Sequence, residues 1–358
     1  MKTSHKFTIA LVILTVIAAA IIWQLRGPPN PATSAAPSAP ATPVFKVAIA
    51  PYQDMAMLMN AKPLGLDKKN GIDLQTPSMA WENLTPAVAS ATPSVDVAFA
   101  SLVQFITQEH SLNAGSSDPI VFFYPAYVFR GGAFVTFNKD VSELTKADLN
   151  NPDKIRQFLS YRFAAQKTSS YEMLLSILAR KVGTSLKDLK VVDMDAGDGL
   201  LAAENNSVDM SSAGLTQRNE AVRRGGRVVL TMDDMGQVDI AGFIAKKSTV
   251  ETKRKEIIGF LNTWADCCTY TLSNLNTNSE HPLAYLRKNS STQYTPEEFA
   301  TALSQELLPN SVADLQTNVV DAGSRYYYGT IVSNTVAYYM ETKALTVPPQ
   351  NIQMLNLP

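Results

Sequence analysis

Apolar and polar positions in the first part of the chain predict strands that alternate with helices. The run FKVAIA predicts a strand, PYQD a polar turn, and MAMLMNA an apolar-rich helix that ends before Pro63 and Gly65. GIDLQ then predicts a short strand and ENLTPAVASA a helix, and the phrase SVDVAFAS leads into another helix, LVQFITQEH. Alternating strands and helices favour parallel α/β packing.

The second part of the chain repeats this order. RFAA predicts a strand, QKTSS a polar turn, and YEMLLSILARKVG a helix closed by Gly183, with apolar residues at helical spacing. LKVVDM is the next predicted strand and GDGLLAAENN a helix. SVDMSSAG then echoes SVDVAFAS, and LTQRNEAVRRGG is a helix with its stop at Gly225. The agreement in order and spacing indicates two similar lobes.

Two strand-like runs that contain glycines join these parts, YVFRGGAFVTFNK at 127–139 and MGQVDIAGFIAKK at 235–247. After the second run the chain turns mostly helical, beginning with VETKRKEIIGFLNTWADCCTYTL. A lobe inserted into another through two strands leaves a cleft between them. Ligands of open α/β sheets bind beyond the carboxyl ends of the strands, at helix N-termini. We therefore expect the polar turns 52–54 and 167–170 to face each other across this cleft.

The N-terminus is expected to carry a signal or membrane anchor within residues 1–25. Lys2 and Lys6 precede the apolar run FTIALVILTVIAAAIIW, which at roughly 17 residues is near the lower limit for a membrane-spanning helix. Since the run continues beyond a candidate Ala-Ala-Ala cleavage site, the pattern favours an uncleaved anchor over a cleaved signal peptide. Lysines before the run favour export of everything after it. The Pro/Ala/Ser-rich residues 26–43 predict an extended linker.

Composition narrows the classes of function. The chain has 358 residues, enough for two domains, and a net charge of -1, which gives no argument for nucleic-acid binding. Cys267 and Cys268 are adjacent, so they cannot link distant segments, and no spacing typical of zinc sites occurs. With 3 histidines in the chain, there is little material for a His-based metal site or catalytic triad. We expect no metal, no cofactor and no catalytic residues.

Five phrases of the chain match the motifs of a known family. They are VAIAPYQD, AKPLGLDKKNGIDLQ, AVASATPSVDVAFAS, GGAFVTFNKD with the following ELTKADL, and AAENNSVDMSSAGLTQR. On these phrases the chain, from about 44 to 345, resembles substrate-binding proteins of ABC importers, in particular the NMT1/THI5-like family for sulfonates, taurine, nitrate and thiamine pyrimidines. It departs from that family at 205–207, where Asn-Asn-Ser stands in place of the usual glycine.

The resemblance implies a type II periplasmic-binding-protein fold, with two α/β lobes, a ligand cleft and a two-strand hinge. Lobe I is expected at 44–130 and 240–358, and lobe II at 131–239. The implied function is that of a monomeric solute-binding protein on the periplasmic side of the inner membrane, or secreted to the periplasm if cleaved. It would deliver a sulfonate, carboxylate or amino acid-like ligand to an ABC permease by hinge closure. A membrane-anchored ligand sensor or adaptor with the same fold is the alternative.

The same family includes fungal enzymes that make the thiamine pyrimidine from their own histidine. That chemistry needs an iron site built on histidines and a cysteine-rich segment. Neither is found in this sequence, because His110 lies on a predicted helix and His281 in a polar loop. We therefore expect a binding protein and no enzyme.

Candidate ligand-binding residues come mainly from the ends of the predicted strands. Asp54 and Ser169 also fit helix N-caps, and Glu172 would complete a capping box with Ser169. A helix N-terminus attracts polar or anionic ligand groups as well, so capping and binding both stay open. Trp81 offers a stacking face for an aromatic or cationic ligand, or packs on the surface. The candidates in these turns and at these helix starts are Tyr52, Gln53, Asp54, Trp81, Ser101, Thr168, Ser169 and Ser170.

The charged candidates would determine the class of ligand. Arg130 at the crossover and Arg218 after SSAGLTQ can each pair with a carboxylate or sulfonate, or remain solvated surface arginines. Asp195, Asp198 and Asp239 are expected in or near turns on the same edge. One of these aspartates facing the cleft would favour an ammonium-bearing or zwitterionic ligand instead.

Overall fold

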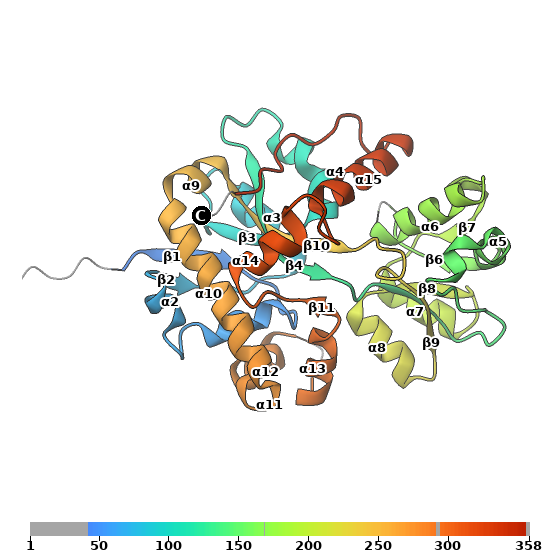
Figure 1. Cartoon of the computed structure of the whole chain (residues 1–358), viewed down its shortest axis with the longest axis horizontal. Coiled ribbons are helices and arrows are strands. Elements are labelled where there is room, and N and C mark those ends of the chain that lie inside the picture. Colours follow the sequence, from blue (N-terminus) through green and yellow to red (C-terminus); the bar gives the residue numbers. More distant parts are fainter. Residues whose placement is uncertain (1–41, 168, 291–293, 356–358) are drawn as a thin grey trace, which may run out of the picture. The chain divides into compact units, whose positions relative to one another are not determined.

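The computed structural model describes residues 42–167, 169–290 and 294–355 of the chain. The predicted anchor at 1–25 and nearly all of the linker at 26–43 lie outside these residues. None of the helices within the described ranges is both long and apolar enough to cross a membrane. Two mixed β-sheets organise the fold, and helices flank each of them (Figure 1).

The first sheet has six strands in the order β11-β4-β10-β3-β1-β2. β1 is parallel to β2 and β3, whereas β10 is antiparallel to β3 and β4. The sheet is therefore parallel on one side and antiparallel on the other. Its strands are β1 (Val44–Ala48), β2 (Asp73–Gln75), β3 (Val97–Ser101), β4 (Ile120–Phe129), β10 (Asp239–Lys246) and β11 (Glu306–Leu307).

The second sheet has five strands in the order β7-β6-β8-β5-β9. β6 is parallel to β7 and β8, whereas β5 is antiparallel to β8 and β9. The parallel strands come from the repeat that the sequence predicts. The strands are β5 (Ala133–Thr136), β6 (Arg162–Ala164), β7 (Lys190–Val192), β8 (Met210–Ala213) and β9 (Arg227–Thr231).

Helices follow the strands of both sheets, as the sequence predicts. Those between strands of the first sheet or after its last return are η1 (Met55–Asn60), α2 (Leu66–Lys69), α3 (Trp81–Ala89), α4 (Leu102–Asn113), α9 (Lys247–Thr252), α10 (Arg254–Ser273), α11 (Leu275–Asn278), α12 (Glu280–Asn289), α13 (Pro296–Leu303), α14 (Val312–Leu315), η4 (Gln316–Val320) and α15 (Tyr328–Glu341). Those of the second sheet are η2 (Asp148–Asn150), α5 (Pro152–Leu159), α6 (Ser170–Lys181), η3 (Leu186–Asp188), α7 (Ala196–Glu204) and α8 (Leu215–Arg223).

The chain crosses between the sheets twice. It leaves the first sheet after β4, passes through 130–132 into β5, and returns from β9 through 232–238 into β10. The Gly-Gly pair thus divides the first predicted crossover run into two strands of different sheets. A further link comes from α15, which packs on α4 and also contacts α6. There the Tyr338 hydroxyl donates to Glu172 over 2.9 Å, and Arg180 pairs with Glu341 at 3.0 Å.

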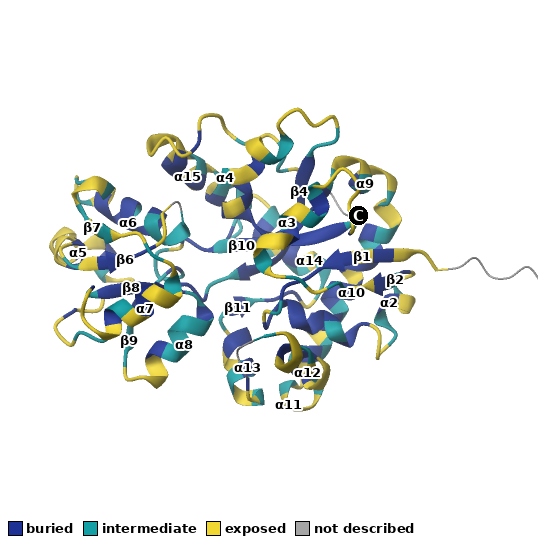
Figure 2. Ribbon diagram, turned by 180° about the vertical axis from the view of Figure 1, so that it is seen from behind, coloured by how far each residue is buried: buried dark blue, intermediate teal, exposed yellow. Residues whose placement is uncertain are grey.

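Aromatic residues fill the core on one face of the first sheet. Phe243 of β10 lies 4.8 Å from the ring centroids of both Phe99 and Phe260, and Trp264 packs against Phe99 at 5.4 Å. The Trp264 indole donates to the carbonyl of Ala126 over 3.0 Å. Because Phe260 and Trp264 belong to α10, this helix covers that face of the sheet. Figure 2 shows the strands of the first sheet buried beneath such helices.

The opposite face of the first sheet is covered by α4. Successive strand residues point to opposite faces. Phe123 of β4 stacks near Phe243 at 6.1 Å, whereas its neighbour Phe122 contacts Phe105 of α4 at 5.9 Å. The second sheet has its own core, in which Phe134 lies 5.6 Å from Phe163. Each sheet is therefore stabilised by packing of its own.

Local structure differs from the predictions at two places. MAMLMNA forms the 3-10 helix η1, because a piece this short is closed by i to i+3 bonds such as Ala61 N–H to Leu58 O, 3.0 Å. His281 lies in α12, not in a loop, since the neighbouring Pro282 fits the first turn of a helix. His110 lies in α4 and Cys267 and Cys268 in α10, as predicted.

The turn at 205–207, where the sequence departs from the family it resembles, contains a residue in the left-handed region. Asn206 has φ of 61°. Asparagine is among the few residues other than glycine that adopt this conformation readily. Asn206 therefore adopts here a conformation that glycine favours.

Substitution of Gly242 in β10 by alanine is expected to destabilise the protein by about 1–3 kcal/mol, the range for overpacking of a filled core. An added Cβ would lie 2.0 Å from Phe122 Cζ and 2.6 Å from the backbone oxygen of Tyr124. Urea unfolding measures the loss. Gly197→Ala is the control, because its Cβ would approach nothing closer than 3.3 Å. Equal midpoints for the two variants would contradict the predicted close packing of β10.

Candidate ligand-binding cleft

A cavity of about 380 Å³ is lined by residues from both sheets, a volume within the range of small-molecule sites. Below it is called the cleft cavity. From the first sheet and its connections it is lined by Tyr52, Gln53, Asp54, Trp81, Ser101, Gln104, Tyr127, Phe129, Asp239 and Ala241. From the second it is lined by Ser170, Tyr171, Gly214, Leu215, Thr216 and Gln217. The two predicted polar turns thus meet at one cavity.

Asp54 is a buried carboxylate in the wall of the cleft cavity. It follows β1 and caps η1, where one of its oxygens accepts from the Met55 backbone N–H over 2.8 Å. The residue is 3% exposed, and burial raises the pKa of its carboxyl group to about 6. Across the residues that the structure describes, no side chain donates to this carboxylate. Asp54 is thus both a cap and an incompletely satisfied acceptor.

Asp239 is the second carboxylate of the cleft cavity, at the first position of β10. Burial raises its pKa to about 6, although hydrogen bonds from the Ser101 side chain and the Val103 backbone oppose this rise. Ser101 itself caps α4 by accepting from the Gln104 N–H over 3.1 Å. The end of β3 and the start of β10 are adjacent in the sheet, which brings Ser101 and Asp239 together.

Aromatic rings make up much of the remaining wall. Tyr52 and Trp81 have ring centroids 5.9 Å apart, and the Trp81 indole donates to Gln104 over 2.9 Å. Tyr127 and Phe129 come from the end of β4, and Tyr171 from the first turn of α6. Burial raises the pKa of Tyr171 well above its usual value, so its hydroxyl stays protonated at neutral pH.

The opposite wall is formed by the starts of α6 and α8. Ser169 caps α6 by accepting from the Glu172 N–H over 3.3 Å, and Ser170 lines the cleft cavity. Ser169 lines a smaller neighbouring cavity of about 290 Å³. Gly214 precedes α8 and offers no side chain as a cap. The first N–H groups of α8 therefore lie at the cleft cavity without a side-chain acceptor from their own N-cap.

Among the predicted site residues that the structure describes, four do not line the cleft cavity. Thr168 lies outside the described residues, and Ser169 lines the neighbouring cavity. Arg130 donates to the carbonyl oxygens of Ser304 at 3.1 Å and Glu306 at 3.3 Å. Asp195 caps α7 by accepting from the N–H groups of Gly197 and Asp198, at 2.8 and 2.9 Å. The remaining one, Arg218, belongs to another cavity.

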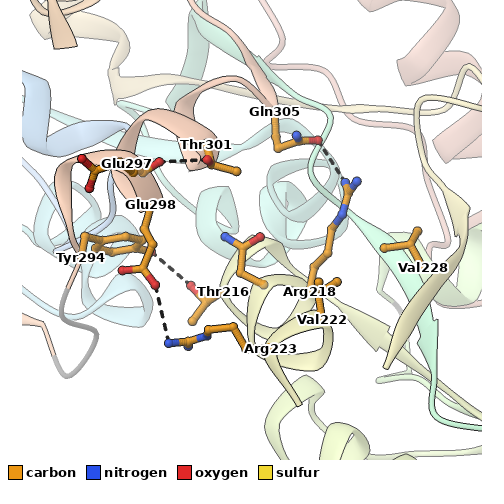
Figure 3. A pocket seen from close by; sticks show the side chains of 11 residues that line it. Thr216, Arg218, Val222, Arg223, Val228, Tyr294, Glu297, Glu298, Thr301 and Gln305 are labelled. Carbon is orange, nitrogen blue, oxygen red and sulfur yellow. Dashed lines mark hydrogen bonds and ion pairs between the residues drawn. The ribbon is translucent and has the colours of Figure 1, made fainter. Parts of the chain in front are cut away.

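That adjoining cavity of about 400 Å³ lies between α8 and α13 (Figure 3). In it Arg218 donates to Gln305 over 3.0 Å, and Arg223 pairs with Glu298 at 3.7 Å. Thr216 lines both this cavity and the cleft cavity, and its hydroxyl lies 3.4 Å from that of Tyr294. Both arginines line this adjoining cavity and neither lines the cleft cavity.

Sequence reasoning did not identify several residues of the cleft wall. Tyr127 and Phe129 lie in a continuous apolar run, in which no pattern shows which side chains line a cavity. Tyr171 has a usable signal, because it follows Ser170 in the first turn of α6. Gln104, Leu215, Thr216 and Gln217 likewise lie at helix starts after a strand, the type of position that the prediction used elsewhere.

Comparisons with known proteins place the fold. The sequence matches no protein-family model, and no curated protein matches it. The structure is similar to that of the periplasmic aliphatic sulphonate binding protein SsuA from Escherichia coli, with a TM-score of 0.62, 17% identity, and coverage of 87% of this chain and 96% of that chain. A putative sulfonate-binding SsuA from Methylobacillus flagellatus KT has a TM-score of 0.63 and 16% identity, over 87% of this chain and 91% of that chain.

The periplasmic nitrate-binding protein NrtA from Synechocystis PCC 6803 is also similar, with a TM-score of 0.56 and 16% identity over 86% of this chain and 84% of that chain. These likenesses establish the fold. The expected α/β periplasmic-binding-protein fold with two sheets is thereby confirmed.

Proposed function

We propose that the protein is an extracytoplasmic solute-binding protein that delivers a small organic ligand to an ABC permease in the inner membrane. The observation that carries this proposal is the cleft cavity, whose wall combines residues of both sheets. The similar solved structures include sulphonate-binding and nitrate-binding periplasmic proteins, which supports a binding role. Among the ligand classes expected from the sequence, an amino acid-like compound agrees best with the two carboxylates of the cavity.

Hinge closure is the proposed mechanism. We assign lobe I to 44–130 and 240–358 and lobe II to 131–239, because the chain passes between the sheets at 130–132 and 232–238. A ligand that contacts both lobes binds the closed form more tightly and shifts the population toward closure. The N-terminal apolar run would hold this body at the periplasmic side of the membrane. We propose that the protein is a monomer. A sensor that reports the ligand to a membrane partner would use the same closure.

A thermal-shift screen of the full-length protein tests the binding role. A small molecule at a hundred times its dissociation constant should stabilise the folded state by about 2.7 kcal/mol through mass action. Recovery of the bound compound, with mass spectrometry to check that it is unchanged, separates binding from turnover. Conversion of a compound without any stabilisation by small ligands would contradict the proposal.

The two serines at the start of α6 should separate capping from binding. Ser169→Ala removes the hydrogen bond to the Glu172 N–H and is expected to lower stability by about 1 kcal/mol. Ser170→Ala removes a hydroxyl from the cleft wall and should weaken ligand affinity with little effect on stability. Urea unfolding and calorimetric titration measure the two effects. Unchanged affinity in the joint Ser169→Ala, Ser170→Ala variant would leave these serines with a capping role alone.

A further inference from the structure

We propose that the solute carries an ammonium group, primary or quaternary, held between Asp54 and Asp239 and the aromatic rings of the cleft cavity. The inference rests on the proposed function, since it assigns a ligand class to the same cavity. It also departs from the sulphonate- and nitrate-binding proteins that share the fold.

The charged side chains that line the cavity are of one sign. Asp54 and Asp239 line it, and its described lining includes no lysine, arginine or histidine. Arg130 and Arg218, which would have marked an anion site, are not among the lining residues, and Arg130 interacts with Glu306 near the two carboxylates. Lys167 lines the smaller neighbouring cavity, is 72% exposed and pairs with Asp193 at 3.5 Å. A sulfonate or carboxylate group would therefore meet two like charges without a cationic side chain to offset them.

Asp54 gives the strongest indication of a missing cation. A buried carboxylate is normally paired with a cation or held by several hydrogen-bond donors. Asp54 receives the backbone N–H groups of Met55 and of Asp54 itself, and among the described residues no side chain donates to it. Its burial and its place in the wall leave room for a donor that comes from the ligand. A primary ammonium group supplies both the missing charge and the missing donor, and a quaternary one supplies the charge.

The tyrosine and cysteine side chains near the two carboxylates stay protonated at physiological pH, because burial raises the pKa of each. Near Asp54 they are Tyr52, Tyr294 and Cys268, and near Asp239 they are Tyr171 and Tyr339. Burial also raises the pKa of Glu306 well above its usual range, and the nearby Arg130 opposes that rise. Asp54 and Asp239 are the carboxylates that line the cleft cavity itself.

Aromatic rings complete the site for a cation. The faces of tryptophan, tyrosine and phenylalanine attract ammonium groups, and several rings together form cages for quaternary ammonium ligands. Tyr52 and Trp81 form one side at a centroid distance of 5.9 Å, and Tyr171 comes from the opposite wall. A zwitterion also fits, because its anionic end can reach the first N–H groups of α8 at Gly214, where the N-cap has no side chain.

The test compares matched cations and anions on the full-length protein. The probes are phenethylammonium and choline as cations, and 3-phenylpropanoate and propanesulfonate as anions, with potassium chloride to match ionic strength. We expect the cations to raise the melting temperature and the anions to leave it unchanged. Calorimetric titration then gives the dissociation constant of the stabilising cation.

Variants connect that binding to the two carboxylates. Asp54→Asn and Asp239→Asn keep the shape of the side chain and an oxygen that can accept from the N–H of Met55 or of Val103. Each substitution is expected to weaken cation affinity at least about tenfold. Asp153→Asn is the control, because its side chain is 91% exposed in a different part of the fold. In the wild type, affinity should also fall between about pH 7.5 and about pH 5, by about tenfold for each carboxylate that becomes protonated.

The outcomes distinguish the two proposals. Stabilisation by 3-phenylpropanoate or propanesulfonate, with none by the cations, overturns the ammonium inference and leaves the binding function standing. Cation binding with the same affinity in wild type, Asp54→Asn and Asp239→Asn also overturns it. A melting temperature that none of the four probes changes counts against both the ligand class and the binding function.

Discussion

Asp54→Asn is expected to make the ligand-free protein more stable above about pH 7, by about 1–3 kcal/mol, while it weakens ligand binding. The pKa of Asp54 rises from 3.8 to about 6 on folding, because the carboxylate is buried. The folded state therefore holds this proton more tightly than the unfolded chain does. The contribution of Asp54 to the free energy of unfolding is largest below pH 3.8 and is lost as pH rises through about 6.

Urea unfolding of wild type and Asp54→Asn across this pH range gives the measurement. The difference in unfolding free energy should be small near pH 4 and should favour the variant increasingly up to about pH 7. Asp153→Asn serves again as the control, since its exposed side chain has no burial to relieve. A variant less stable than wild type at pH 7 would mean that Asp54 is retained for structure and not for a ligand. Stability gained together with affinity lost is the pattern expected of a binding residue.

Phe243→Ala is expected to lower the free energy of unfolding by about 3–5 kcal/mol. Phe243 is fully buried in β10, with Phe99 and Phe260 both at 4.8 Å and Trp264 at 6.3 Å. Removal of its ring leaves a cavity between the sheet and α10 that rigid aromatic neighbours cannot fill. Because β10 also begins with Asp239, the damage would reach the cleft.

Urea unfolding followed by intrinsic fluorescence measures this loss, with Trp264 as a reporter at the same core. Phe243→Leu retains most of the buried volume and should lose clearly less. Val222→Ala, at an exposed position of α8, should leave the unfolding midpoint nearly unchanged. If Phe243→Ala behaved like Val222→Ala, this aromatic cluster would not be the main core of the first sheet.

The alternation of strands and helices was predictable from the sequence, because the spacing of apolar residues within each segment and the residues that end it are local features. Gly183 and Gly225 have φ of 74° and 88° just after α6 and α8, where helix ends were predicted. The same local signals placed Asp54 and Ser170 at helix starts. Since both helices follow strand ends, the topology brings these two residues to one cavity.

The charged residues of the site could not be sorted from the sequence, because their partners come from distant segments. Arg218 is held by Gln305, which is 87 residues away along the chain, and Arg130 by the carbonyl of Ser304, 174 residues away. No local pattern reveals such contacts. The proposed class of ligand depends on where these residues lie, because neither arginine lines the cleft cavity, whereas Asp54 and Asp239 do.

We expect a solute to bind between the two proposed lobes and to draw them together. Leu64, between η1 and α2, is exposed in proposed lobe I, and Val192 of β7 is exposed in proposed lobe II. Because the native Cys267 and Cys268 are buried, the substitutions Leu64→Cys and Val192→Cys allow selective spin labelling at these two positions. Double electron–electron resonance on this full-length variant, with and without the cation that stabilises it most, reports the distance between the labels. We predict that the cation shifts and narrows the distance distribution, and that Asp54→Asn abolishes the shift. A saturating ligand that leaves the distribution unchanged would contradict closure of the lobes around a bound solute.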